Sequence, residues 1–207
     1  MAKIIVVNGY AGSGKSSHCM RLSQEGYSGM PVQHISAGNL LRGIRTGIST
    51  SVYSDIINSR DAPSPLPDGI VGGAILESIE ECGNATPLVL IDGYPRHPNA
   101  VESFRYELKD KSHLLLGTIA LQVSMDTSIT RILKRGERAG EKIKAHTLEE
   151  FAIQRYDLDQ RTTNISIDAL SRFAPVEIMD ASGEINSVYS VFKRSINNLL
   201  LHYSSIE

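Results

Sequence analysis

The sequence is poor in cysteine, the residue that builds disulfide frameworks and many structural zinc sites. Only Cys19 and Cys82 occur among 207 residues. Neither has a second cysteine or a histidine at the spacing of a zinc ligand pair, which argues against a disulfide framework and against a structural metal. We expect both cysteines to be buried as small apolar side chains.

The sequence also lacks an excess of basic residues and any long apolar run. Lysine and arginine number 21 against 23 acidic residues, for a net charge of -2. A protein that neutralises many phosphates of a nucleic acid would be basic, so no nucleic-acid polymer is expected as a partner. No stretch approaches the roughly 18 apolar residues of a membrane span, and the first residues contain no cleavage-like site. We expect a cytoplasmic protein without membrane contact.

What is present is an alternation of short, β-branched apolar runs with helical patterns. The runs cover residues 4–7, 32–35, 88–91, 119–123 and 176–179. This alternation is typical of an α/β fold with a parallel sheet and crossover helices on both faces. With 207 residues and 41% hydrophobic content, one domain over residues 1–207 is expected. We predict five parallel strands in the order 2-3-1-4-5, with a ligand cleft at their C-terminal edge.

The intervals between the runs predict helices. Residues 15–25 read as a helix closed by Gly26, and residues 40–57 as a helical pattern broken at Gly43 and Gly47. Asp68 reads as the N-cap of an amphipathic helix, so residues 37–83 form a helical insertion between two strands. Later helices are predicted over 126–135, 147–170 and 185–203, with a polar, glycine-containing loop at 136–146.

Residues 9–16, Gly-Tyr-Ala-Gly-Ser-Gly-Lys-Ser, match the P-loop pattern G-x-x-x-x-G-K-[ST]. They lie between an apolar strand and a helix, the context that the mechanism requires. Backbone N–H groups of such a loop face the phosphates of ATP, Lys15 reaches the outer phosphates, and the Ser16 hydroxyl is a ligand of Mg²⁺. The predicted ATP-binding residues of this segment are Gly12, Ser13, Gly14, Lys15, Ser16 and Ser17.

An acid follows the buried strand 88–91 directly. Asp92 stands where a P-loop enzyme holds its metal, directly or through water. We therefore predict Ser16 and Asp92 as the metal-binding pair.

Two further segments carry a family resemblance. Asp-Gly-Tyr-Pro-Arg at 92–96 and Ser-Ala-Gly-Asn-Leu-Leu-Arg at 36–42 resemble, nearly letter for letter, elements of the nucleoside monophosphate kinases, the adenylate kinases and UMP/CMP kinases. Residues 131–137 are similar to the segment before the lid of that family, and the resemblance covers essentially the whole chain. It makes residues 37–83 the acceptor-binding insertion and residues 136–146 a short lid.

The resemblance implies a phosphotransferase that acts on small nucleotides, ATP and a nucleoside monophosphate, as a monomer. Arg42 and Arg96 would hold the acceptor's phosphate, Arg131 would lie over the donor, and Arg135 and Arg155 would approach the transferred phosphoryl. Arginine forks suit these tasks because they match phosphate oxygens. The implied catalytic residues are Lys15, Arg96, Arg135 and Arg155. The implied acceptor-binding residues are Ser36, Ala37, Arg42, Asp92, Gly93, Arg96 and Asn99.

The sequence departs from the family pattern in the lid and in the second motif. Glu141, Ile143 and Lys144 align where the family has an arginine followed by two acids, so one phosphate-binding arginine is missing from its place. Asn39 replaces an acid. Two alternatives to a nucleoside monophosphate kinase stay open: another small-molecule kinase of the P-loop class, and a nucleotide-binding sensor with weak turnover.

The identity of the acceptor base also stays open. Ala37 is the residue that UMP/CMP kinases commonly have, where adenylate kinases usually have threonine. The base-reading position four residues after Arg96 is Ala100, and Asn99 precedes it; a shift of one residue is conceivable because Pro98 can alter the helix start. AMP and the pyrimidine monophosphates therefore both fit. The six histidines show no triad or ligand spacing, and we expect them in solvated or turn positions.

Overall fold

The computed structural model describes residues 1–59, 66–81, 88–138 and 145–205. Its centre is a sheet of five parallel strands in the order β2-β3-β1-β4-β5, which confirms the predicted strand number and order. The strands are β1 (Lys3–Gly9), β2 (Val32–Ser36), β3 (Leu88–Asp92), β4 (Leu114–Gln122) and β5 (Val176–Asp180).

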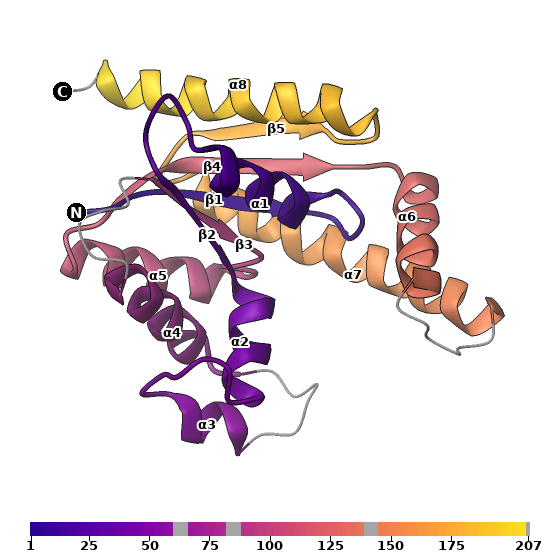
Figure 1. The fold of residues 1–207 in the computed structure, drawn as a ribbon, viewed down its shortest axis with the longest axis horizontal. Coiled ribbons are helices and arrows are strands. Elements are labelled where there is room, and N and C mark those ends of the chain that lie inside the picture. The colour runs from indigo at the N-terminus through magenta and orange to yellow at the C-terminus, as the bar shows by residue number, and fades with distance from the viewer. Residues whose placement is uncertain (60–65, 82–87, 139–144, 206–207) are drawn as a thin grey trace.

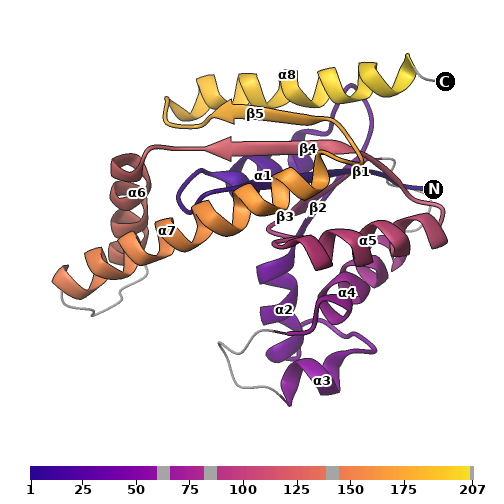
Figure 2. The same ribbon diagram turned by 180° about the vertical axis from the view of Figure 1, so that it is seen from behind.

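Alternate side chains of the central strand β1 divide the core into two layers. Ile5 and Val7 pack with α1 (Lys15–Glu25) and α8 (Ile185–Ser204). Ile4 and Val6 pack on the opposite face with α5 (Pro98–Asp110) and the end of α7 (Ala145–Leu170). Both layers follow from the two-residue period of a strand that is buried on both faces. Figures 1 and 2 show these helices on the two faces of the sheet.

Cys19 bears out the expectation for the cysteines, because its side chain lies fully buried in the α1–α8 layer. Cys82 lies outside the described residues. Among the residues that the structure describes, no helix is long and apolar enough to cross a membrane.

An arm of three helices connects β2 to β3; the first two project away from the sheet, and the third returns beside α5 (Figure 1). It consists of α2 (Ala37–Arg45), α3 (Ser54–Asn58) and α4 (Asp68–Glu81). The predicted break at Gly43 is wrong, because α2 continues through it. A helix tolerates an interior glycine at a cost of about 1 kcal/mol, and burial of Ile44 against Ile57 and Ala74 offsets that cost. The predicted break at Gly47 is confirmed, since α2 ends before this residue, whose φ is 72°.

After the end of β4, α6 (Met125–Arg138) leads towards α7. The predicted end of this helix at residue 135 is three residues too early, and α7 begins two residues before its predicted start at residue 147. Residues 139–144 of the predicted lid, which include Glu141, Ile143 and Lys144, lie outside the described residues.

Candidate active site

The C-terminal edge of the sheet gathers the predicted phosphate-binding segments. Asp92 at the end of β3 pairs in register with Val7 of β1 and with Ser36 of β2. Because parallel strands end at the same edge, the P-loop after β1, Asp92 and the start of α2 lie side by side there. The fold therefore brings together segments that are up to 85 residues apart in the sequence, from Val7 to Asp92.

Glycines shape the P-loop at two places whose geometry favours this residue. A Cβ atom on Gly9 would lie 2.3 Å from the carbonyl oxygen of Leu121, so only glycine permits this approach of β1 to β4. Gly14 precedes α1 with φ 86°, in the left-handed region that favours glycine. The loop therefore turns directly into the N-terminus of α1, whose free N–H groups suit an anion.

The P-loop lysine is held by the loop's own carbonyl groups. Lys15 Nζ donates hydrogen bonds to the backbone oxygens of Gly9 at 2.8 Å and Tyr10 at 2.9 Å. Burial lowers the pKa of Lys15, and the carboxylates of Asp92 and Asp159 offset part of this effect. A phosphate group beside Lys15 would strengthen the charged form of this buried amine.

Ser16 and Asp92 are in direct contact, since the Ser16 hydroxyl donates to Asp92 Oδ2. His34 Nε2 lies 3.6 Å from the same oxygen. Burial raises the pKa of the Asp92 carboxyl, but the neighbouring His34 and Ser16 outweigh burial, so this pKa lies below its ordinary value. Asp92 is thus an ionised carboxylate next to a hydroxyl, a pair of hard oxygen donors of the kind that Mg²⁺ prefers.

Two histidines contradict the expectation of solvated or turn positions. His34 lies mostly buried beside Asp92, and His18 is buried against the rings of Tyr189 and Phe192, with centroid distances of 5.9 and 5.7 Å. Sequence spacing gives no signal for either contact. The His34 contact depends on the pairing of β2 with β3, and the His18 contacts on the packing of α1 against α8.

Arg131 joins the P-loop to the connection between β5 and α8. Its Nη1 donates to the carbonyl oxygens of Gly12 at 3.1 Å and Ala181 at 2.8 Å, and its Nη2 to those of Ser182 at 3.2 Å and Gly183 at 3.1 Å. Four backbone acceptors therefore fix this guanidinium beside the P-loop.

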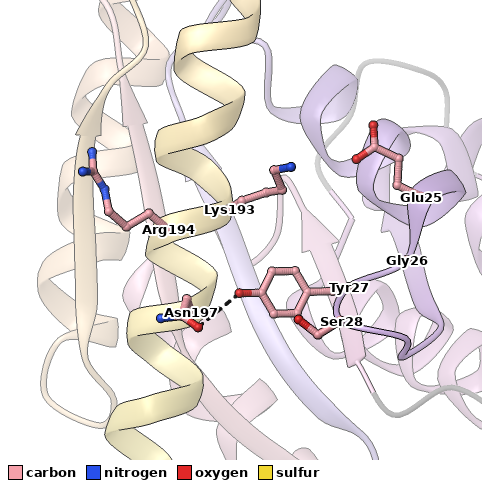
Figure 3. Close-up of a pocket in the computed structure, with 7 residues that line it drawn as sticks. All are labelled: Glu25, Gly26, Tyr27, Ser28, Lys193, Arg194 and Asn197. Carbon is pink, nitrogen blue, oxygen red and sulfur yellow. Dashed lines mark hydrogen bonds between the residues drawn. The ribbon is translucent and has the colours of Figure 1, made fainter.

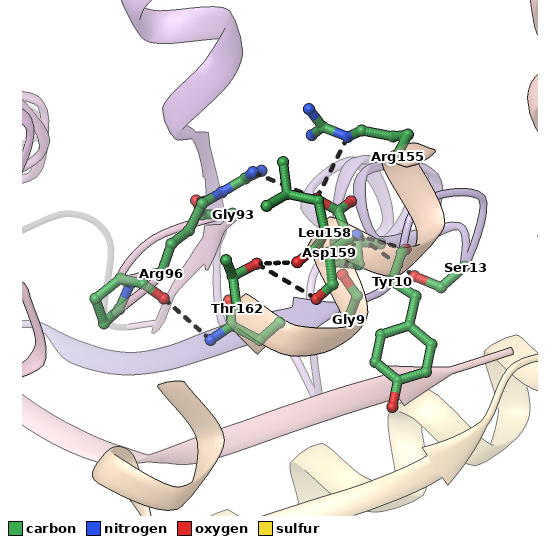
Figure 4. A network of polar contacts seen from close by, with 12 residues as sticks. Gly9, Tyr10, Ser13, Gly93, Arg96, Arg155, Leu158, Asp159 and Thr162 are labelled. Carbon is green, nitrogen blue, oxygen red and sulfur yellow. Dashed lines mark hydrogen bonds and ion pairs between the residues drawn. The ribbon is translucent and has the colours of Figure 1, made fainter. Parts of the chain in front are cut away.

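Arg96 and Arg155 share one buried carboxylate, shown in Figure 4. Asp159 Oδ1 lies 3.7 Å from Arg96 Nη1 and 3.3 Å from Arg155 Nε. Arg96 Nε also donates to the carbonyl oxygen of Gly93 at 2.9 Å. Asp159 is missing from the residues predicted from the sequence, although its position four residues after Arg155 on a helix is a signal for that ion pair. The sequence gives no such signal for the contact between Asp159 and Arg96.

Hydrogen bonds of two α7 residues, Ser166 and Asn164, anchor this helix beside the site. Ser166 Oγ donates to the carbonyl oxygen of Pro95 at 2.7 Å, and Asn8 Nδ2 donates to Ser166 Oγ at 3.3 Å and to the same carbonyl at 3.2 Å. In addition, Tyr10 Oη donates to Asn164 Oδ1 at 3.1 Å. These bonds tie the helix that carries Arg155 to the end of β1 and to the segment that carries Arg96.

The predicted acceptor residues are less firmly held. Arg42 is exposed, and its Nη2 donates to the side chain of Asn39 one turn earlier on α2. Asn99 is exposed near the start of α5, whereas Ala100 is fully buried in the core. Of the remaining predicted residues, Ala37 is buried, Ser36 half-buried, and Ser17 and Arg135 exposed.

A hollow of about 540 Å³ lies elsewhere, between the C-terminal end of α1 and α8 (Figure 3). Tyr27 Oη and Asn197 Oδ1, 3.4 Å apart, join its two walls. Because α1 starts at the P-loop and runs away from it, this hollow is not part of the phosphate-binding edge.

A parallel sheet with helices on both faces, a P-loop that opens α1 and an acid at the end of the neighbouring strand define a P-loop kinase fold. A family model described as an AAA domain matches residues 8–149. The chain is 26% identical to an adenylate kinase of Oenococcus oeni over 201 residues, which cover 96% of this chain and 100% of that protein. It is 29% identical to adenylate kinase isoenzyme 1 of Rattus norvegicus over 193 residues, 91% of each protein. The chain therefore belongs to the nucleoside monophosphate kinase family, whose enzymes are phosphotransferases with a phosphate group as acceptor.

Proposed function

We propose that this chain transfers the γ-phosphoryl group of ATP to a nucleoside monophosphate, which gives two nucleoside diphosphates. The observation that carries the proposal is the convergence of a lysine, a serine–aspartate pair and two arginines on one sheet edge. Phosphoryl transfer needs alignment and spread positive charge more than it needs a covalent partner, and these groups can supply both. They are Lys15, Ser16, Asp92, Arg96 and Arg155.

The same edge suits Mg²⁺ as the cofactor. Ser16 and the ionised Asp92 offer oxygen ligands directly or through water, and Mg²⁺ normally keeps several waters beside one or two protein ligands. When bound, the ion neutralises part of the charge of the triphosphate.

Each arginine has a place in this proposal. Arg131 lies next to Gly12 and so borders the donor, which the P-loop residues 12–17 hold through their N–H groups. Arg42 holds the acceptor's phosphate. Arg96 lies between the acceptor and the transferred group, and Arg155 and Arg135 stabilise the negative charge of that group.

We propose AMP as the acceptor, because the relatives reported above are named adenylate kinases. A pyrimidine monophosphate is the second candidate, and two observations favour it. Ala37 is the residue that UMP/CMP kinases commonly have, and Asn99 is exposed, whereas Ala100 is buried in the core. Residues 37–83 would close over the acceptor and residues 136–146 over the donor; a cytoplasmic monomer belongs to the same proposal.

A coupled assay with ATP, Mg²⁺ and each of AMP, UMP, CMP, dCMP and GMP tests the proposal. ADP formation that depends on AMP, with smaller rates for the other four, is the expected result. A preference for UMP or CMP would replace AMP by a pyrimidine. If ATP binds but none of the five accepts a phosphoryl group, the chain is a kinase for another small molecule or a nucleotide sensor.

A further inference from the structure

Asp159 is a buried acid in a site that has to bind anions. The residue is only 5% exposed, whereas the side chains of Arg96 and Arg155 are 50% and 39% exposed. Burial of a carboxylate is costly unless charged partners compensate for it, and such a group is seldom placed without them. The two arginines are those partners.

The carboxylate is held in position by the helix that carries it. Asp159 follows Arg155 by one turn of α7, and the contacts of Asn164 and Ser166 fix this helix against Tyr10 and Pro95. Arg96 comes from a different element, the segment after β3. Asp159 is therefore a fixed point that contacts both arginines, which come from different elements.

The contacts with Asp159 use only some of the N–H groups of each guanidinium. An arginine has five N–H donors, and Asp159 faces Nη1 of Arg96 and Nε of Arg155. Because both arginines are about half-exposed, the rest of each fork remains on the solvent side. The negative charge of Asp159 also reduces the repulsion between two cations that lie within reach of one oxygen atom.

We propose that Asp159 is a positioning residue that holds Arg96 and Arg155 as a pair with their open N–H groups directed at the transferred phosphoryl group. It does not contact the phosphate, since two anions would repel. It acts through the arginines, so that they need little rearrangement when the phosphates arrive. The inference rests on the proposed function for the chemistry, but the orientation of the arginines is measurable without turnover.

Asp159→Asn is the main variant, because asparagine keeps the shape and removes the charge. Asp168→Asn, an exposed acid on the same helix, is the matched control. We expect Asp159→Asn to lower kcat by about 10- to 100-fold, the scale of a small misplacement of a catalytic group. The KM values for both nucleotides should change by less than about threefold, because a pure orientation effect appears mainly in kcat.

A double-mutant cycle separates positioning from general stability. If Asp159 acts through Arg155, Asp159→Asn should cost much less activity in an Arg155→Ala background than in the wild-type protein. Equal losses in both backgrounds would contradict the proposal. So would an Asp159→Asn enzyme as active as the wild type, or tighter binding of inorganic phosphate by this variant, which would make Asp159 a competitor of the substrate.

Nitrogen-15 spectra of the arginine Nε–H groups supply the readout that does not need activity. We expect a sharp Arg155 signal in the wild type and in Asp168→Asn, and a broadened signal in Asp159→Asn. If Asp159→Asn unfolds, Asp159→Glu is the second variant, because glutamate keeps the charge but moves it by one methylene. A normal kcat of the Asp159→Glu enzyme would overturn the proposal. If the wild type shows the ordered signals but phosphorylates no monophosphate, the proposed function fails while the positioning role stands.

Discussion

Arg131 and Arg42 are both predicted to face a nucleotide, yet the structure holds them in different ways. Arg131 donates to four backbone carbonyl groups, from the P-loop and from the β5–α8 connection. Arg42 is exposed on α2 and contacts the side chain of its neighbour Asn39. The predicted donor side of the site is thus part of the core, whereas the predicted acceptor side stands on a projecting arm. If Arg42 binds the acceptor's phosphate as proposed, the phosphate has to fix this side chain, whereas the backbone already fixes Arg131.

The largest effect should come from the donor side. Lys15→Ala is expected to lower kcat by at least about 100-fold, the scale seen when one preorganised charge is removed from a transition state. Its fold should persist, because the Lys15 ammonium bonds to loop carbonyls and to the Ser13 hydroxyl and does not belong to the apolar core. Steady-state assays together with circular dichroism check both statements. Lys109→Ala, which removes an exposed lysine on α5, should behave as wild type; near-normal turnover in a folded Lys15→Ala protein would contradict the assignment.

A substitution on the acceptor side should change mainly the affinity for the monophosphate. Arg42→Ala is expected to raise KM for the monophosphate by about tenfold, the equivalent of one lost charge-assisted hydrogen bond. The KM for ATP should stay unchanged, because Arg42 lies on the arm and not at the P-loop. Initial rates measured with each substrate varied in turn test this division, and Arg172→Ala, at an exposed arginine just after α7, is the control. A rise in the KM for ATP instead would remove the distinction between the two sides.

The smallest effect concerns the seam between the arm and the core. Glu107 on α5 faces α4, with Oε2 buried and without a hydrogen-bond partner among the described atoms, and Ser103 donating to Oε1. Burial raises the pKa of Glu107. The folded protein therefore favours the neutral acid, and stability falls as the pH rises through this raised pKa.

Glu107→Gln should remove the loss of stability that accompanies ionisation of Glu107. We expect it to raise the midpoint of thermal unfolding at pH 7 by no more than about 2–4 °C, and the difference from wild type should shrink as the pH falls below the pKa of the carboxyl. Thermal unfolding followed by circular dichroism between pH 4 and 7 measures this. Glu102→Gln, at an exposed acid of the same helix, should show no such trend. A constant difference at every pH would mean that the charge of Glu107 is unimportant.

The elements that depend on local patterns were predictable from the sequence. The alternation of apolar runs and helices is enough to predict the sheet, and the P-loop marks its own strand, turn and helix. Helix ends were predicted less well, because packing overrides propensity: α2 passes through Gly43, and α6 passes through residues 136–138.

The contacts inside the site were predictable only in part. The P-loop and Asp92 follow from motif and strand order, but His34 reaches Asp92 through the pairing of β2 with β3. Asp159 meets Arg96 only because α7 docks beside the segment after β3. Such long-range contacts have no periodic signal in a single sequence.

The small core of the arm has a consequence for how the molecule opens. Ile44, Ile57 and Ala74 form a cluster of their own, separate from the two layers that flank the sheet. Regions with few buried apolar contacts unfold locally at a lower free energy than the main core. The end of the arm around α3 is therefore expected to open locally while β1 and the P-loop stay folded, whereas Ile75, Leu76 and Ile79 keep α4 in the main core. We expect substitutions at Ile57 to change mainly this local opening, whereas substitutions at Ile5 would change the stability of the whole fold.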